Sequence, residues 1–270
     1  MIVRRALPFS REALYAGEIY LLPPTERSLR LVAAMNAEMD VELGAPSREA
    51  QFRFPDPEFF RRVGRLRKLF YTGPAWHEEV RGLLREAGLD PADFAFDPIR
   101  LRSIAHKGHE NPRAAPIYYG HRDTWYSNPQ AQITGWLPLH DVSEAETFVF
   151  WPEFFQKPVR NDSAAFDHDA WTRDDRSRKI GWQNRNTSLE ASYPQLREEV
   201  DGERWTFSAP AGSLLFFSGQ HLHRTTPNLT GRTRFSADFR IVHLDDHRRG
   251  LGAPNVDNRS TGSALPDHVR

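Results

Sequence analysis

The chain has 270 residues, of which 39% are hydrophobic and 12% are aromatic, so we expect a folded protein with a substantial core. Its 36 Lys and Arg residues balance its 36 Asp and Glu residues, and this formal net charge of zero excludes nucleic-acid binding driven by bulk charge. The chain has no cysteine, no signal-peptide-like N-terminal run and no stretch of about 18 apolar residues, which excludes disulfides and thiolate chemistry and predicts a cytoplasmic protein without membrane-spanning helices.

Residues 1–98 are expected to be mainly helical. A short strand at 18–22 precedes a predicted helix that Thr25 caps. Two more helices are predicted, one that begins at Pro55 and one over 75–87. The apolar residues of the Pro55 helix recur at the spacing of one helix face: Phe59, Phe60, Val63, Leu66 and Leu69. We expect these helices to cover a sheet rather than to form a domain of their own.

From Ile99 the pattern changes to strands and turns. The predicted strands lie at 100–105, 130–139, 147–151, 204–207, 212–217 and 232–242. Near the middle of the chain, apolar side chains alternate with Gln132, Thr134 and Trp136, which is typical of a sheet with helices on one face and a polar cavity on the other. The last predicted strand alternates in the same way, and Arg234 lies on its polar face.

This order of elements predicts an α+β fold in a single domain that spans residues 1–270. Its expected core, residues 99–242, is a double-stranded β-helix (a jelly roll, cupin-like), with the N-terminal helices packed on the outer sheet. The long polar stretch 153–203 is expected to be a lid or insertion. Residues 243–270 are expected to be a poorly ordered or docking C-terminal tail.

A metal site is indicated by His121 and Asp123. In an extended segment, residues two apart point to the same side, so this imidazole and this carboxylate can bind one small ion. The third ligand can come from His221 or His223, which also share one face, so spacing does not separate them. Two His and one carboxylate on one face of an ion leave the opposite positions open, as non-haem Fe(II) oxygenases require.

A second group of residues fits a dicarboxylate. Arg234 stands eleven residues after His223 (234 − 223 = 11), on the polar face of its predicted strand. Its guanidinium can hold a carboxylate bidentately, in a fork geometry that Lys cannot copy. Thr225 lies on the same strand face as His223 and can donate its hydroxyl to the same carboxylate.

In combination, these motifs resemble the phytanoyl-CoA dioxygenase-like family of Fe(II)- and 2-oxoglutarate-dependent oxygenases. That family shows H-x-D, a strand of the Q-x-x-x-W-x-x-L-x-D type, G-(D/S)-x-x-x-F, and H-x-(S/T)-x-x-N with an Arg eleven residues after the His. The corresponding segments here are His121–Asp123, Gln132–Asp141, Gly212–Phe217 and His223–Asn228, followed by Arg234. The resemblance covers residues 99–242 and is specific in its combination of motifs.

The resemblance implies a jelly-roll core and an Fe(II) site made of His121, Asp123 and His223. His223 is favoured over His221 because the family's Asn and Arg follow it at the matching distances. In related halogenases a small residue takes the place of the carboxylate ligand. Because Asp123 is present, the resemblance favours hydroxylation, desaturation or cyclisation over chlorination.

The resemblance also implies that Arg234 holds 2-oxoglutarate with help from Thr225, while Thr134 and Gln132 make further contacts with this co-substrate. With O2 as the other co-substrate, the expected reaction oxidises, first of all by hydroxylation, an aliphatic C–H of a small polar metabolite. Succinate and CO2 are the expected by-products.

The substrate itself is not carried over from the family. Ser143–Glu146 replaces the family's glycine-rich turn, and Pro152–Phe155 replaces its usual P-G-S-H, where the substrate loops begin. We expect the substrate to lie under residues 153–203, against Trp136 and Trp151.

A run of arginines in the expected lid, Arg173, Arg176 and Arg178, points to an anionic or polar small molecule, and the family points to secondary metabolism. The alternative for these arginines is a solvated charge cluster with Asp174 and Asp175.

Two other functions fit the same residues. One is a cupin-like metalloenzyme that does not use 2-oxoglutarate and in which Arg234 is structural. The other is a non-catalytic binding domain on the same fold, which the complete set of metal ligands disfavours. No nucleic-acid or membrane partner is expected, and the oligomeric state is left open.

Overall fold

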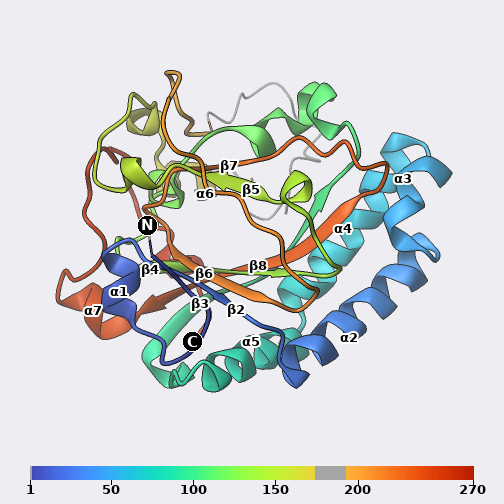
Figure 1. The fold of residues 1–270 in the computed structure, drawn as a ribbon, viewed down its shortest axis with the longest axis horizontal. Coiled ribbons are helices and arrows are strands. Elements are labelled where there is room, and N and C mark those ends of the chain that lie inside the picture. The colour runs from blue at the N-terminus through green and yellow to red at the C-terminus, as the bar shows by residue number, and fades with distance from the viewer. Residues whose placement is uncertain (1, 174–192) are drawn as a thin grey trace.

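The computed structural model describes residues 2–173 and 193–270. In this part of the chain, a mixed α/β fold is built on a main sheet of six strands, in the order β1-β2-β6-β4-β8-β3 (Figure 1). A smaller sheet of two strands pairs β5 with β7. The strands are β1 Val3–Arg4, β2 Ile19–Leu22, β3 Phe94–Ile104, β4 Gln132–Pro138, β5 Phe148–Phe150, β6 Leu214–Ser218, β7 His223–Thr225 and β8 Arg234–His243.

The strands that carry the candidate site lie in the middle of the main sheet. β4 pairs antiparallel with β6 on one side and with β8 on the other, while β8 also pairs antiparallel with β3. The register places Thr134 opposite Phe217 and Arg240. The polar residues of β4 and β8 therefore share one face, as their alternation in the sequence predicts.

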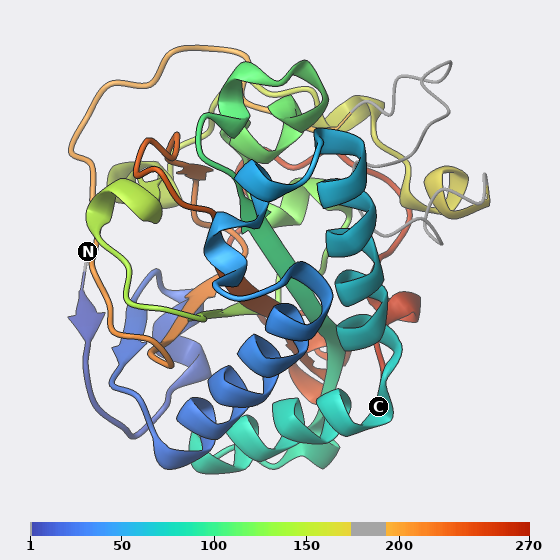
Figure 2. The same ribbon diagram turned by 90° about the vertical axis from the view of Figure 1, so that its right-hand side faces the viewer.

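The α-helices of the described residues are α1 Arg11–Tyr15, α2 Glu26–Leu43, α3 Ala50–Arg53, α4 Asp56–Thr72, α5 Pro74–Glu86, α6 His168–Arg173 and α7 Leu244–Arg248. Thr25 caps α2 in a capping box with Ser28, because each side chain accepts a backbone N–H that the first turn leaves unpaired. Helices α2, α4 and α5 lie against the main sheet in Figure 2. The predicted helices at the start of the chain are thus present.

Two apolar clusters lie on opposite faces of the main sheet. The first joins α2, α4 and α5 to side chains such as Ile133 and Phe239. The second joins Trp136 and Phe217 of the main sheet to Phe148 of the small sheet. Because alternate residues of β4 enter different clusters, this strand separates the helical layer from the face that carries the candidate site.

Several boundaries differ from the sequence prediction. β3 begins at Phe94 rather than near residue 100, and it passes through Pro98 at a register shift between Asp97 and Arg100. An edge strand tolerates this proline because the missing N–H faces no further strand. The predicted strand at 204–207 is reduced to one bridge between Trp205 and Phe150. In α4, Leu69 flanks the buried stripe and is 40% exposed.

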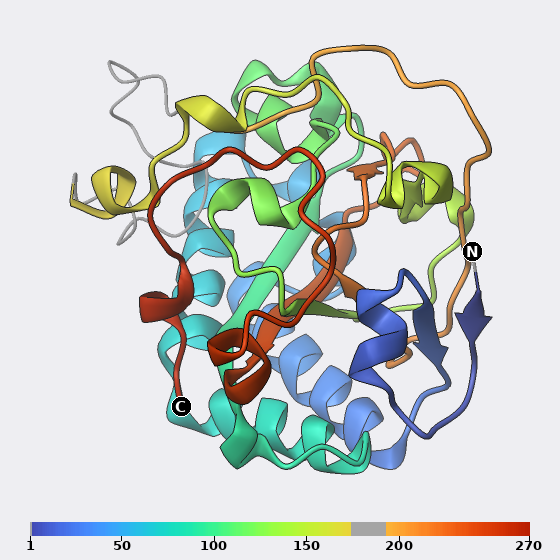
Figure 3. The same cartoon turned by 90° about the vertical axis from the view of Figure 1, so that its left-hand side faces the viewer.

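The C-terminal segment, residues 249–270, is docked on the rest of the chain (Figure 3). Phe96 and Val269 exchange two backbone hydrogen bonds of 2.9 and 2.8 Å. These two bonds pair the end of the chain with β3. The expected tail 243–270 begins differently, because β8 runs to His243 and α7 Leu244–Arg248 follows it. Within the two described ranges, no helix is both long enough and apolar enough to span a membrane.

A buried ion cluster on the polar face of the sheet gives a stability prediction. The Asp97 carboxylate accepts hydrogen bonds from Arg100 at 2.5 and 3.0 Å and from Arg240 at 3.0 Å. Burial alone would raise the pKa of Asp97, but these two arginines lower it to about 2. Because the folded-state pKa is depressed, the ionised carboxylate stabilises the fold fully above about pH 4, and this contribution is lost as the pH falls toward 2.

Replacing Asp97 with Asn is expected to lower the free energy of unfolding by about 3 kcal/mol near neutral pH, because the partly buried Arg100 and Arg240 lose their shared partner. Between pH 5 and pH 2, the difference between the native protein and Asp97→Asn is expected to shrink by about 2 kcal/mol. Urea unfolding at a series of pH values measures this. Asp245→Asn, at an exposed carboxylate, is the control. A difference that stays constant with pH would contradict the prediction.

Candidate metal centre

His121, Asp123 and His223 come together in the structure, with one ligand atom from each lying within 4.8 Å of the others. Paired backbones set this arrangement. His121 and His223 each donate a backbone N–H to the other's carbonyl at 3.0 Å, as one bridge of an antiparallel pair. Arg122 between the first two residues is extended, with φ −109° and ψ 140°. His121 and Asp123 therefore point to the same side, as the sequence predicts.

The imidazoles of His121 and His223 are oriented by backbone carbonyls. Nδ1 of His121 lies 2.8 Å from the carbonyl of Tyr119, and Nδ1 of His223 lies 3.0 Å from that of His221. A carbonyl only accepts, so each Nδ1 carries the proton and each Nε2 keeps its lone pair for an ion. Burial, followed by the charge of His121, lowers the pKa of His223 to about 4. The His223 ring is therefore neutral at neutral pH, as a metal ligand must be.

The Asp123 carboxylate is buried and held in place from three sides. Its Oδ2 accepts a hydrogen bond of 2.6 Å from Thr134 Oγ1 and one of 3.3 Å from Gln132 Nε2, and Arg240 lies 3.6 Å from its Oδ1. Burial alone would raise the pKa of Asp123, but the charge of Arg240, and after it the two histidines, hold it well below the usual range. The carboxylate is therefore ionised and ready to bind a cation.

His221 lies outside this cluster. Its side chain is buried, and its ring packs on Phe155 with 4.6 Å between ring centroids. Neither ring nitrogen has a hydrogen-bond partner in the described residues, and burial lowers the pKa of His221 to about 3. The cluster of possible ligands in the described residues contains His223 instead, because His223 is the residue paired with His121.

Arg234 is a buried cation without an acidic partner. It is 2% exposed, its Nε donates to the carbonyl of Glu146 at 2.9 Å and its Nη1 donates to Ser236 Oγ at 2.6 Å. No carboxylate in the described residues forms an ion pair with it. Burial lowers the pKa of Arg234 to about 10, so the guanidinium is still charged at neutral pH. The charges of Asp238 and Glu146 offset this burial only in part, and a buried charge without an ion pair is costly unless an anion binds beside it.

The other predicted co-substrate residues fall into two groups. Thr225 is half-buried on β7 and pairs with Phe148 of β5. Phe148 stands two residues after Glu146, whose backbone carbonyl accepts a hydrogen bond from Arg234. Gln132 and Thr134 instead direct their side chains at the Asp123 carboxylate and at each other, with 2.7 Å from Gln132 Nε2 to Thr134 Oγ1. In the protein as it stands, these two residues support a metal ligand.

Replacing Thr134 with Val tests that support. The change removes the 2.6 Å hydrogen bond to Asp123 and nearly keeps the side-chain volume. We expect metal affinity to fall about tenfold, as is usual when an outer partner of a ligand is lost. Thr134→Ser, which keeps the hydroxyl, is the matched control, and titration of the metal-free protein with Co(II) is the measurement. Unchanged metal affinity combined with weaker 2-oxoglutarate binding would instead make Thr134 a co-substrate contact.

The predicted substrate residues are placed as follows. Trp136 donates its indole N–H to Ser236 at 3.0 Å, and the guanidinium carbon of Arg234 lies 5.8 Å from its ring centroid. Trp151 is 2% exposed and belongs to a third apolar cluster, together with Trp125. Arg173 ends α6, and its side chain lies outside the described residues, as do Arg176, Arg178, Asp174 and Asp175.

Three residues of the site were missed by sequence reasoning. The Tyr126 ring meets the His121 ring edge-on, with 5.5 Å between centroids. Arg240 approaches Asp123, and Ser236 receives donors from both Arg234 and Trp136. The signal for Ser236 and Arg240 was present in the polar alternation of β8, but alternation does not say which polar residue meets which partner.

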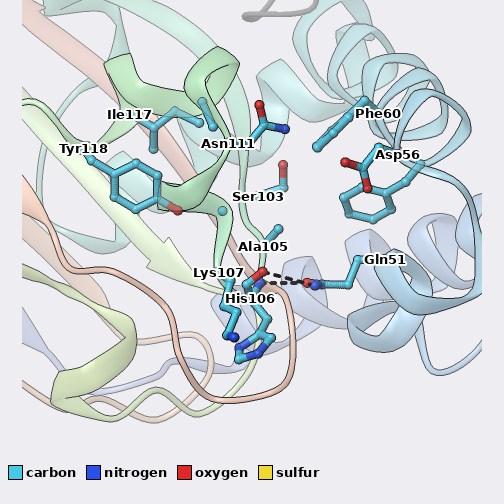
Figure 4. A pocket seen from close by; sticks show the side chains of 13 residues that line it. Gln51, Asp56, Phe60, Ser103, Ala105, His106, Lys107, Asn111, Ile117 and Tyr118 are labelled. Atoms are coloured by element: carbon cyan, nitrogen blue, oxygen red, sulfur yellow. Dashed lines mark hydrogen bonds between the residues drawn. The ribbon is translucent and has the colours of Figure 1, made fainter.

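A cavity of about 100 Å³ lies at the end of β3, between that strand and the start of α4. Figure 4 shows Gln51, Ser103, Asn111 and Tyr118 around it, and none of the three clustered metal-ligand candidates lines it. Burial raises the pKa of Tyr118 to about 12, and the charge of Arg234 opposes this rise. Tyr118 thus lies between this cavity and the surroundings of Arg234.

Comparison with known proteins gives a likeness of fold. No protein-family model and no curated protein matches the sequence. The structure is similar to that of EvdO2 from Micromonospora carbonacea var. aurantiaca, with a TM-score of 0.51 and 14% identity over 90% of this chain and 94% of that chain. It is also similar to EvdO2 complexed with 2-oxoglutarate, with a TM-score of 0.50 and the same identity and coverage. The chain therefore shares the fold of EvdO2, on which it places a cluster of two imidazoles and one carboxylate.

Proposed function

We propose that this protein is a non-haem Fe(II)- and 2-oxoglutarate-dependent dioxygenase, of the phytanoyl-CoA dioxygenase-like kind. The observation that carries this proposal is the pairing of two features within one fold. One is the His121, Asp123 and His223 cluster, and the other is the buried Arg234, which forms no ion pair within the described part of the chain. The first fits a metal ion, and the second fits an anionic co-substrate.

The donor set of the cluster fits Fe(II). Two imidazoles and one ionised carboxylate form the ligand set that is typical of non-haem iron oxygenases, with the remaining coordination positions left to small molecules. The backbone carbonyls behind both imidazoles, and Thr134 behind the carboxylate, supply the outer hydrogen bonds that fix such ligands. The site is thus prepared for a divalent ion before the ion arrives.

The surroundings of Arg234 fit the far carboxylate of 2-oxoglutarate. The guanidinium is held by Ser236 and the carbonyl of Glu146, which fix its direction without neutralising its charge. A carboxylate can therefore form a charge-assisted pair with it. Thr225 is assigned to the same carboxylate. The likeness of fold to EvdO2, one structure of which holds 2-oxoglutarate, supports this assignment.

When bound, iron, 2-oxoglutarate and O2 would supply the oxidising chemistry, in which an aliphatic C–H of the substrate is oxidised while 2-oxoglutarate yields succinate and CO2. The chain itself orients the imidazoles, keeps Asp123 ionised and holds the co-substrate at Arg234. Hydroxylation is the outcome we propose first, with desaturation or cyclisation as variants, because the carboxylate ligand is present.

The finer architecture is also part of this proposal. We assign residues 1–270 to one oxygenase domain whose core, 99–242, is a jelly roll supported by the N-terminal helices. Of the expected lid at 153–203, residues 174–192 lie outside the described part of the chain, so the lid is proposed for 153–173 and 193–203. The packing of Phe148 of the small sheet on Trp136 and Phe217 of the main sheet supports this assignment.

The substrate is proposed to be a small polar metabolite of secondary metabolism that approaches the metal on the side of Tyr126. The contact between the Tyr126 and His121 rings makes this tyrosine a wall of the metal centre. Trp151 and Arg173 are proposed substrate contacts. Trp136 is proposed to line the space shared with the co-substrate, since it lies against Arg234.

Anaerobic addition of Fe(II) and then 2-oxoglutarate tests the proposed function. A visible metal-to-ligand charge-transfer band is expected only when both are present, and a screen of metabolite pools for substrate-dependent succinate release then searches for the substrate. Failure to bind Fe(II) would reject the metalloenzyme. Fe(II) binding without any effect of 2-oxoglutarate would leave a cupin-like metalloenzyme that does not use this co-substrate.

A further inference from the structure

Arg122, the residue between two candidate metal ligands, is buried completely. Its side chain is 0% exposed, and its donors reach four acceptors in three separate parts of the chain. Nε donates to Asp257 at 3.1 Å, and Nη1 donates to the carbonyl of Gln220 at 2.6 Å. Nη2 donates to the carbonyls of Phe154 and Lys157, both at 2.8 Å. This single guanidinium therefore joins the segments around both candidate histidine ligands to the loop after β5 and to the C-terminal segment.

Asp257 is the anchor of this guanidinium. Its side chain is 5% exposed, and its Oδ1 also accepts the indole N–H of Trp125 at 2.8 Å. Its Oδ2 accepts the backbone N–H of Val159 at 3.0 Å, and its carbonyl accepts from Asn161 at 3.2 Å. The Asp257 carboxylate thus accepts hydrogen bonds from Arg122 and Trp125, which flank Asp123, and from the loop at Val159.

The Arg122 side chain points away from those of His121 and Asp123, and this direction links its contacts to the candidate metal ligands. In an extended residue, the side chain points away from those of its two neighbours, so a fixed Arg122 fixes the opposite face that carries His121 and Asp123. The hydrogen bond to the carbonyl of Gln220 also links the 121–123 segment to the residues just before His223. Both sides of the three-residue cluster are therefore held by one group.

Stability alone explains this pair poorly. Burying an ion pair costs desolvation that the mutual attraction of the charges only roughly offsets, so such a pair is weak evidence for a stabilising role. Burial lowers the pKa of Arg122, while the charge of Asp257 opposes this effect. The benefit of a fully satisfied buried network is instead a single, well-defined arrangement of the groups attached to it.

We infer that Arg122 and Asp257 are a positioning pair for the metal centre. Through this pair, the C-terminal segment helps to orient His121, Asp123 and His223. This inference rests on the proposed metal-binding function. It predicts that weakening the pair lowers metal affinity, although neither residue touches the metal.

Asp257→Asn tests the pair against a matched control. Asn keeps the shape of the side chain but removes the charge that holds Arg122. The control is Asp246→Asn in the same C-terminal region. Asp246 is equally buried, at 7% exposure, and accepts from Arg11 at 2.8 Å and from Tyr15 at 3.0 Å, away from Arg122. A loss of general stability should affect both variants, whereas a loss of positioning should affect only Asp257→Asn.

The measurement is titration of the metal-free protein with Co(II), followed by its visible absorption bands, with thermal unfolding recorded in parallel. We expect the Kd for Co(II) to rise about tenfold in Asp257→Asn, the lower end of the effect of losing an outer partner, and to stay within about twofold in Asp246→Asn. Arg122→Lys keeps the charge but not the fork of donors, so it is expected to show the same direction. If Asp257→Asn does not fold, the Co(II) affinity of Arg122→Lys tests the positioning role instead.

Native-like Co(II) affinity in a folded Asp257→Asn or Arg122→Lys variant would overturn the positioning role while leaving the proposed metal centre intact. An equal loss of affinity in Asp246→Asn would also overturn it, since the effect would then follow stability. A native protein that binds no Co(II) would overturn the proposed centre, and with it this inference.

Discussion

Replacing Asp123 with Ala is expected to lower the affinity for Fe(II) about 100-fold or more and to remove the charge-transfer band seen with 2-oxoglutarate. Asp123 is the only acidic member of the three-residue cluster, so its loss removes the one negative charge that attracts the ion within that cluster. The loss of one charged ligand, at about 3 kcal/mol, corresponds to a factor of this size. Anaerobic titration with Fe(II), with and without 2-oxoglutarate, measures both effects, and substrate-independent succinate release is expected to stop.

Asp245→Ala is the control for this variant, because it removes an exposed carboxylate of α7 whose side chain is 48% exposed. It is expected to leave Fe(II) binding unchanged. Asp123→Ala is expected to remain folded, since Thr134 and Gln132 can bond to each other when the carboxylate is gone. If Asp123→Ala kept native-like Fe(II) affinity and the band, the cluster would not be the iron site.

Replacing Arg234 with Gln is expected to weaken 2-oxoglutarate binding about 100-fold while Fe(II) binding stays unchanged. The guanidinium is the buried cation that we assign to the far carboxylate, and a charge-assisted bidentate pair contributes about 3 kcal/mol. Arg234→Lys keeps the charge but offers no fork, so a loss of about tenfold is expected. Titration of the Fe(II)-loaded variants with 2-oxoglutarate, read from the charge-transfer band, gives the affinities.

The stability of Arg234→Gln separates a binding role from a structural one. Burial lowers the pKa of Arg234 to about 10, so its charge destabilises the folded protein at neutral pH, where the group is protonated. Removing a charge of this kind should therefore lower the free energy of unfolding by no more than about 1 kcal/mol. Arg232→Gln, at an exposed arginine just before β8, is the matched control for both measurements.

A large loss of stability in Arg234→Gln, with unchanged 2-oxoglutarate affinity, would make Arg234 a structural residue. That outcome would favour a metalloenzyme that does not use 2-oxoglutarate, and it would leave the metal centre itself untouched.

Local sequence pattern determined much of the scaffold. The alternation in β4 and β8 predicted which residues face the helices and which face the site, because the side-chain period of a strand is two whatever its partners are. The start of α2 was readable for a similar reason, since a capping residue acts on backbone groups a few residues away. The first part of β3 was not predicted, because Pro98 argues against a strand unless that strand lies at the edge of its sheet. Which strand lies at the edge depends on the order of all the strands in the sheet.

The sequence also determined the chemistry that the site can offer. His121 and Asp123 share a face because the residue between them is extended, and the combination of sequence motifs by itself indicates His223 and Arg234. Spacing alone could not choose between His221 and His223, because residues two apart would share one face of an extended strand. The choice follows from the backbone pairing of His121 with His223, a contact between residues that are far apart in the chain.

Tertiary structure alone decided how the site is supported. It turned Gln132 and Thr134 toward Asp123, and it brought Asp257 from the C-terminal segment to Arg122. Each of these contacts joins side chains from different strands or loops. Such contacts cannot be read from the residue types of a short stretch of sequence. Among residues 2–173 and 193–270, tertiary structure also left Arg234 without a carboxylate at ion-pair distance. The sequence by itself therefore indicated the candidate ligands and the face that they share, whereas folding determined which partners orient them and shift their pKa values, because only long-range pairing brings those partners close.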